Sequence, residues 1–155
     1  MPSATVSHPM PCSSAVVFEL LHDYDRRLEW DTLLREARLT RGCTVAKKGA
    51  TSLCVGEPLF GWIGVETRYL TFVPGSIAAV EMINRPPFFE HFAASIRHED
   101  AAEGSLLTYK LNFTARPRFL RWLLDPIMLV ALRYETRKRL AALAEFLGKE
   151  GQSAR

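Results

Sequence analysis

Residues 117–148, with the sequence PRFLRWLLDPIMLVALRYETRKRLAALAEFLG, decide the fold of this chain. Within them, side chains suited to one buried helical face recur at spacings of three and four: Leu129, Leu132, Thr136, Leu140, Leu143 and Leu147. This periodicity predicts a long amphipathic helix whose main body covers residues 126–148. Because proline suits the first turn of a helix, Asp125 is expected to cap the segment that begins at Pro126.

The chain before this helix is expected to form strands, because its apolar and polar residues alternate with period two. Turn signals such as Pro74-Gly75 and Glu103-Gly104 separate the strand-like runs. After a first strand at 5–8, which Pro9 should end, the runs cover residues 36–41, 51–56, 60–73, 77–83, 88–98 and 105–115. Two short helices, at 14–22 and 26–33, are expected after the first strand. The fold class is therefore α+β.

The length of 155 residues suits a single domain that can bury a sizeable core. We assign residues 1–148 to this domain and residues 149–155 to a flexible tail. The 48% of hydrophobic and 24% of charged residues are typical of a soluble globular protein. In the second short helix, Leu28 and Trp30 should face inward. Gly61 and Gly64 are interpreted as bends that let the sheet curl.

Alternation also assigns the two faces of each strand, because successive side chains point to opposite sides. Burying charge is costly, so Glu66 and Arg68 should face solvent and their neighbours should face inward. The inward set is Ile63, Val65, Thr67, Tyr69, Thr71, Val80, Met82, Phe92, Ala94, Ile96, Leu107, Tyr109, Leu111 and Phe113. Glu90 falls on the inward face by parity, near the start of its strand. It is expected either at a solvated rim or, if buried, as a general base with a raised pKa.

The order strand, two helices, six strands and long helix resembles the START-like superfamily, also called SRPBCC. The residues that carry the likeness are AVVFELLHD at 15–23, Trp30-Asp31 and RKRLAALAEFL at 137–147. They look like the first and last helices of its polyketide cyclase/dehydrase and lipid-transport group. The resemblance implies a helix-grip fold, in which a curved antiparallel sheet of about seven strands wraps around the C-terminal helix, with a hydrophobic cavity between them. It implies no shared catalytic residue set.

The function that this reading favours is the binding of a hydrophobic small molecule or lipid, for transport or sensing, rather than catalysis. Inward hydroxyls would orient such a ligand while apolar side chains supply affinity. The candidate ligand-binding residues are Thr67, Tyr69, Met82, Phe92, Ile96, Tyr109, Leu111, Phe113, Trp122 and Met128. One alternative is a cyclase- or dehydratase-like enzyme in which Tyr69, Tyr109 and either Glu90 or His91 move protons. The other is a module that binds ribosome or nucleic acid.

No motif in the sequence predicts a metal or a cofactor. The histidines His8, His22, His91 and His98 lack the spacing of a metal site, and no phosphate-binding glycine loop is present. His98-Glu99-Asp100 is expected to be a solvated cluster at a hairpin turn, and His91 should lie on the outer face. The 3 cysteines show no CxxC spacing, which predicts reduced thiols in a cytoplasmic protein.

Neither membrane insertion nor strong nucleic-acid binding is expected. Residues 1–10 lack the pattern of a secretory signal. The most apolar run, 119–132, is shorter than the roughly 20 residues that a membrane span needs. The net charge of +3 is mild for a nucleic-acid protein.

The C-terminal quarter is basic, so peripheral contact with a membrane surface stays an alternative. The residues that make it basic are Arg116, Arg118, Arg121, Arg133, Arg137, Lys138 and Arg139. A solvated helix face with a Glu135–Arg139 pair is the default interpretation, and contact with anionic lipid is the alternative. The apolar residues around Trp122 are expected to be core, to gate the cavity mouth or to touch a membrane surface.

Overall fold

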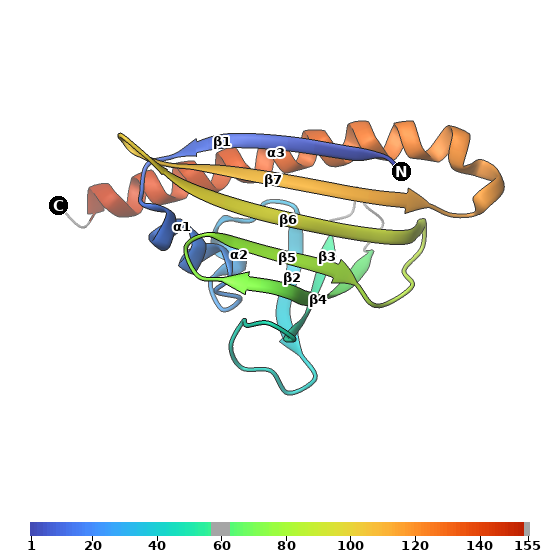
Figure 1. Ribbon diagram of the computed structural model, residues 1–155, viewed down its shortest axis with the longest axis horizontal. Helices are drawn as coiled ribbons and strands as arrows, with labels where there is room; N and C mark the ends of the chain where they lie inside the picture. The colour runs from blue at the N-terminus through green and yellow to red at the C-terminus, as the bar shows by residue number, and fades with distance from the viewer. Residues whose placement is uncertain (57–62, 154–155) are drawn as a thin grey trace.

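The computed structural model describes residues 1–56 and 63–153 (Figure 1). Its elements are β1 (Ser3–Met10), α1 (Ser14–Leu21), α2 (Arg27–Trp30), β2 (Leu34–Thr40), β3 (Thr51–Gly56), β4 (Gly64–Val73), β5 (Ile77–Met82), β6 (Phe89–Ala101), β7 (Gly104–Ala115), a 3-10 turn (Arg118–Leu120) and α3 (Arg121–Ser153). The strands form a 7-stranded antiparallel sheet in the order β1-β7-β6-β5-β4-β3-β2. The expected α+β helix-grip architecture is confirmed.

The helix α3 packs against β1 and β7 and runs along them in Figure 1. Leu140, Leu143 and Leu147 are buried in the main core, as the helical periodicity predicted. They share this core with inward side chains of β1, β6 and β7, namely Ala4, Val6, Ala94, Ile96, Leu107, Tyr109, Leu111 and Phe113. Leu129 and Leu132 extend this contact as half-buried residues. The long helix therefore closes the concave face of the sheet.

Both ends of α3 differ from the expectation. The helix begins at Arg121, so Pro126 lies inside it and Asp125 is not its cap. Instead, an Asp125 carboxylate oxygen accepts a hydrogen bond from the amide of Ala115 at 3.0 Å, which ties the end of β7 to the helix. At the other end, residues 149–153 are helical rather than irregular.

Two β-bulges explain where the predicted alternation fails. A bulge inserts an extra residue and moves the following side chains to the opposite face. The register shift between Tyr69 and Thr71 exposes Thr71 and turns Phe72 inward, against Phe18. A second shift, between Phe89 and His91, leaves Glu90 exposed and buries Phe89. Glu90 is therefore not a buried base.

Among the smaller expectations, the one for Trp30 is confirmed, and those for Leu28 and for the end of β1 are wrong. Leu28 is 50% exposed, whereas Trp30 is buried as expected. The strand β1 continues through Pro9 to Met10, because β1 is an edge strand and a missing amide donor costs little there. The proposed bend at Gly61 and the strand start at residue 60 lie outside the described residues. Within the described part of the chain, no helix is long and apolar enough to cross a membrane.

Candidate functional site

A cavity of about 140 Å³ lies between the sheet and α3. Most of its wall is apolar, and polar side chains gather at one end. The lining residues are His22, Tyr24, Arg27, Leu33, Leu34, Ser52, Cys54, Gly56, Ile63, Val65, Thr67, Tyr69, Val80, Phe89, Phe92, Ile96, Tyr109, Leu132 and Arg139. On β4, Ile63, Val65, Thr67 and Tyr69 all line it, which agrees with the face that alternation assigned to this strand.

The structure brings half of the predicted ligand-binding residues to this cavity. Those that line it are Thr67, Tyr69, Phe92, Ile96 and Tyr109. Leu111 and Phe113 are fully buried in the core, and Met82 and Met128 pack against that core without lining the cavity. Trp122 is 76% exposed on α3 and lies away from the cavity. Contact of any of these residues with a ligand stays a prediction.

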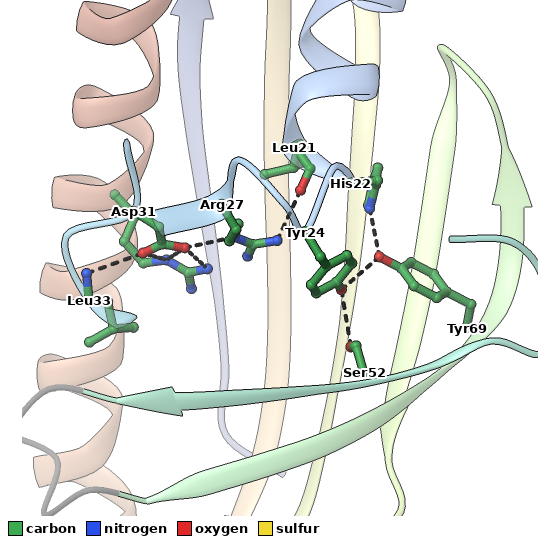
Figure 2. Close-up of polar contacts among 9 residues, drawn as sticks. Leu21, His22, Tyr24, Arg27, Asp31, Leu33, Ser52 and Tyr69 are labelled. Carbon is green, nitrogen blue, oxygen red and sulfur yellow. Dashed lines mark hydrogen bonds and ion pairs between the residues drawn. The ribbon is translucent and has the colours of Figure 1, made fainter. Parts of the chain in front are cut away.

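A chain of hydrogen bonds runs along the polar end of the cavity, and Figure 2 shows its part from His22 to Ser52. His22 Nδ1 lies 2.7 Å from the Tyr69 hydroxyl, which is 2.9 Å from the Tyr24 hydroxyl. Tyr24 donates to Ser52 Oγ at 3.0 Å, and Ser52 Oγ lies 3.1 Å from Thr67 Oγ1. We call these five residues the hydroxyl chain. Its members come from the end of α1, the following loop, β3 and β4, so they meet only in the folded protein.

Burial keeps the ionisable members of the hydroxyl chain uncharged near neutral pH. Burial raises the pKa of Tyr69 well above its usual value, and it also raises the pKa of Tyr24. Burial, with Arg27 and His98 nearby, lowers the pKa of His22 to about 3. His22 Nε2 is buried without a hydrogen-bond partner. The chain is therefore a set of neutral donors and acceptors.

Beside the hydroxyl chain, the buried Arg27 and the half-buried Arg139 share the buried Asp31, and Figure 2 labels Arg27 and Asp31. Asp31 Oδ2 accepts from Arg27 Nε at 2.9 Å and from Arg139 Nη2 at 2.9 Å. Arg27 also donates to the Leu21 carbonyl at 2.9 Å, and the Leu33 amide donates to Asp31 at 3.1 Å. This cluster joins α2 to α3 and places two guanidinium groups on the cavity wall. The expected solvated Glu135–Arg139 pair is wrong, because Arg139 turns inward to Asp31.

The charge state of Asp31 follows from competing effects. Burial alone would raise the pKa of its carboxyl group, but Arg139 and Arg27 outweigh that effect and hold the pKa below its usual value. Asp31 is thus ionised at neutral pH. With two guanidinium groups against one carboxylate, the cluster keeps a net positive charge.

His98 is also buried, contrary to the expected solvated cluster. It lies on the inward face of β6 with its ring 5.2 Å from that of Phe18, and neither ring nitrogen has a hydrogen-bond partner. Burial lowers the pKa of His98 to about 4. The inward parity that it shares with Ile96 was the sequence signal for this burial.

These two histidines predict acid sensitivity. Their pKa values are lower in the folded than in the unfolded state, so unfolding takes up protons as the pH falls below the unfolded value of about 6.5. Burial of each histidine should therefore lower the free energy of unfolding by about 2 kcal/mol as the pH falls from about 7 to about 5. His98→Leu should remove the part of this pH-dependent loss that is due to His98. Urea denaturation of wild type and variant at both pH values would measure the difference. An unchanged pH dependence in this variant would show that His98 is not buried as described.

A second, larger hollow of about 940 Å³ lies between α1 and residues 37–46. Several of its lining residues, including Glu19, Asp25, Arg38 and Val45, are exposed, which identifies it as a surface depression. His22 and Tyr24 belong to both walls. The interior cavity is the better candidate site despite its smaller volume, because the whole hydroxyl chain lines it together with a mostly apolar wall.

The described part of the chain offers no evident metal-binding site. No group of three or more His, Cys, Asp or Glu side chains is placed there to hold a metal ion. The cysteines Cys12, Cys43 and Cys54 are free thiols and half-buried.

A seven-stranded antiparallel sheet closed by a long C-terminal helix over a cavity defines a helix-grip protein. The family model described as polyketide cyclase/dehydrase and lipid transport matches residues 1–148, and the chain belongs to this family. No curated protein matches the chain.

Solved structures with the same fold are similar to it at low sequence identity. The ZhuI aromatase/cyclase of a Streptomyces strain has a TM-score of 0.81 and 11% identity, covering 99% of this chain and 96% of its own. TTHA0849 of Thermus thermophilus has a TM-score of 0.80 and 10% identity, with 96% and 99% coverage. The di-domain aromatase/cyclase StfQ of the steffimycin pathway has a TM-score of 0.77 and 12% identity, with 97% and 52% coverage.

Proposed function

We propose that this protein binds a small, largely apolar molecule in the interior cavity, with an oxygen-bearing group directed at the hydroxyl chain. The observation that carries the proposal is the convergence of four hydroxyls and one imidazole, beside Arg27 and Arg139, on a wall that is mostly apolar. Neutral hydroxyls can donate to and accept from a ligand carbonyl, hydroxyl or ether, while the aliphatic and aromatic wall supplies affinity.

The size of the cavity limits what fits without movement. A volume of 140 Å³ is close to that of the engineered apolar cavities of about 150 Å³ that hold one benzene molecule. A ligand of one ring therefore fits the cavity as it stands. Drug-sized ligands occupy pockets of about 300–1,000 Å³, so a lipid or a polyketide would require α3 or the β2–β4 edge to shift outward.

A cyclase- or dehydratase-like activity is the second candidate. It is favoured by two tyrosines and a histidine that share one hydrogen-bond chain on the cavity wall, and by the aromatase/cyclase names of two structural relatives. Proton abstraction near neutral pH needs a base whose pKa is close to the working pH. The lowered pKa of His22 and the raised pKa values of both tyrosines do not meet that requirement. Binding is therefore the better supported function.

The remaining alternatives gain less support. One of the arginines that a nucleic-acid module would need on its surface, Arg139, instead lies inside with Asp31. A cytoplasmic location stays a proposal, supported by the three free thiols.

A titration with an apolar fluorescent probe, alongside native mass spectrometry for a retained ligand, tests the proposal. The wild type should bind the probe at one site per chain. Val65→Phe, on the cavity wall, should fill the space and weaken probe binding about tenfold or more with little loss of stability. Val16→Phe adds the same atoms to an exposed residue of α1 and should change neither property.

Two results would contradict binding in this cavity. One is a wild type that binds no probe together with a Val65→Phe variant destabilised by about 1–3 kcal/mol, as expected for overpacking a solid core. The other is equal probe binding by wild type and Val65→Phe. Turnover of a cyclisable substrate that is lost in both Tyr24→Phe and Tyr69→Phe would instead establish the catalytic alternative.

A further inference from the structure

We propose that the outer face of the first half of α3 docks on the surface of an anionic lipid bilayer. We define this docking face by its exposed apolar residues: Phe119, Trp122, Leu123, Ile127, Val130 and Tyr134. The inference goes beyond the proposed function and does not depend on a ligand in the cavity.

Four residues of the docking face form a helical stripe, and Phe119 of the 3-10 turn and Trp122 precede this stripe in the chain. From Leu123 to Ile127, Val130 and Tyr134, the spacings of four, three and four keep the side chains on one side of α3. Trp122 is 76% exposed and Val130 is 69% exposed. Contiguous exposed apolar surface of this kind marks an interaction site.

The opposite side of the same helical segment is apolar too. Met128, Leu129 and Leu132 pack inward against the core, and Leu132 lines the cavity. A helix that is apolar on all sides is normally covered on all sides. Among the described residues, the sheet covers one side of this segment and the other side stays exposed, which favours a partner on that side.

Charge identifies the partner as an anionic bilayer. The exposed Arg118 and the half-buried Arg121 lie at one end of the docking face, and the exposed Arg137 and Lys138 lie at the other with the half-buried Arg133. The acidic residues between 105 and 144 are Asp125, which is half-buried and bonded to the Ala115 amide, and Glu135, which is buried. An apolar centre with tryptophan and tyrosine, flanked by exposed positive charge, matches the acyl boundary and the phosphate layer of a membrane surface.

Two other occupants fit the same surface less well. A symmetric dimer through this face would place the same patch on both subunits, so basic rims would meet with no exposed carboxylate between them. Nucleic acid would leave Leu123, Ile127 and Val130 against phosphates, without bases stacked on them.

Co-sedimentation of the purified chain with lipid vesicles tests the inference. The wild type should bind vesicles that contain phosphatidylglycerol, should bind pure phosphatidylcholine vesicles more weakly, and should be partly released by high salt. Val130→Asp should lower the partition coefficient about tenfold or more, because it inserts a charge into the centre of the docking face. Arg137→Glu combined with Lys138→Glu should abolish the preference for anionic lipid. Val73→Asp, a matched change at an exposed valine of β4, should bind as the wild type does.

Thermal melts of all variants should be close to that of the wild type, because each substituted side chain is exposed. The inference is overturned if the wild type ignores anionic vesicles at low salt, or if Val130→Asp binds them as well as Val73→Asp does. It is also overturned if the wild type is a dimer that Val130→Asp converts to a monomer while vesicle binding is absent. Binding of single-stranded RNA in place of vesicles would overturn it in favour of a nucleic-acid surface.

Discussion

Asp31→Ala should lower the free energy of unfolding by about 3–5 kcal/mol, because it leaves two buried guanidinium groups without their shared carboxylate. The Asp31 side chain is 0% exposed, and those of Arg27 and Arg139 are 8% and 13% exposed, so water cannot replace it well. Urea denaturation at neutral pH measures the change. Glu29→Ala is the matched control, because Glu29 pairs with Arg26 at the surface and its loss should cost less than about 1 kcal/mol.

The same cluster has a predictable pH dependence. The pKa of Asp31 is lower in the folded than in the unfolded state, so its stabilisation is complete above the unfolded value of about 3.9. The stabilisation is lost as the pH falls through the folded pKa. Replacing all three residues together, with Arg27→Met, Asp31→Leu and Arg139→Met, should recover most of the stability that Asp31→Ala loses. If Asp31→Ala costs no more than Glu29→Ala, the cluster is solvated and the described packing is incorrect.

Leu143→Ala should cost about 2–5 kcal/mol, the range for removing a buried leucine and leaving a cavity behind. Leu143 is 0% exposed and lies where α3 packs on the sheet. Ile127→Ala, on the exposed face of the same helix, should change stability by only about 0.5 kcal/mol. Equal denaturation midpoints for the two variants would mean that the buried face of α3 has been assigned wrongly.

The fold was predictable because its main determinants are periodic and local. Leu140, Leu143 and Leu147 lie on one helical face wherever the helix begins, because they are three and four residues apart. Strand alternation places Val65, Thr67 and Tyr69 on one face in the same way. Strand alternation failed at two places where the backbone adds a residue. The bulges at Tyr69/Thr71 and Phe89/His91 reversed the parity of Thr71 and Glu90, and the sequence carries no glycine or proline within these two steps to announce them.

The candidate site was only partly predictable. Its strand residues, Thr67, Tyr69 and Tyr109, follow from alternation, but strand alternation could not reach His22, Tyr24 or Arg139, which lie outside the strands. Tyr24 is in the loop that follows α1 and meets Ser52 of β3 only after the sheet has formed. Arg139 looked like part of a solvated helix face, since four of its near neighbours in sequence are charged.

The amino-acid sequence by itself determined the order of elements, the buried face of α3 and the inward side of most strands. Each of these follows from the period at which apolar side chains repeat along the chain. Only the tertiary structure decided which polar groups share the cavity and which arginine is buried. Those outcomes depend on contacts between residues far apart in sequence. Arg139 binds Asp31, which is 108 residues away, and Tyr69 is hydrogen-bonded to His22, which is 47 residues away. A charge or hydroxyl is buried only where such a distant partner offsets the loss of its water, and no local pattern encodes that partner.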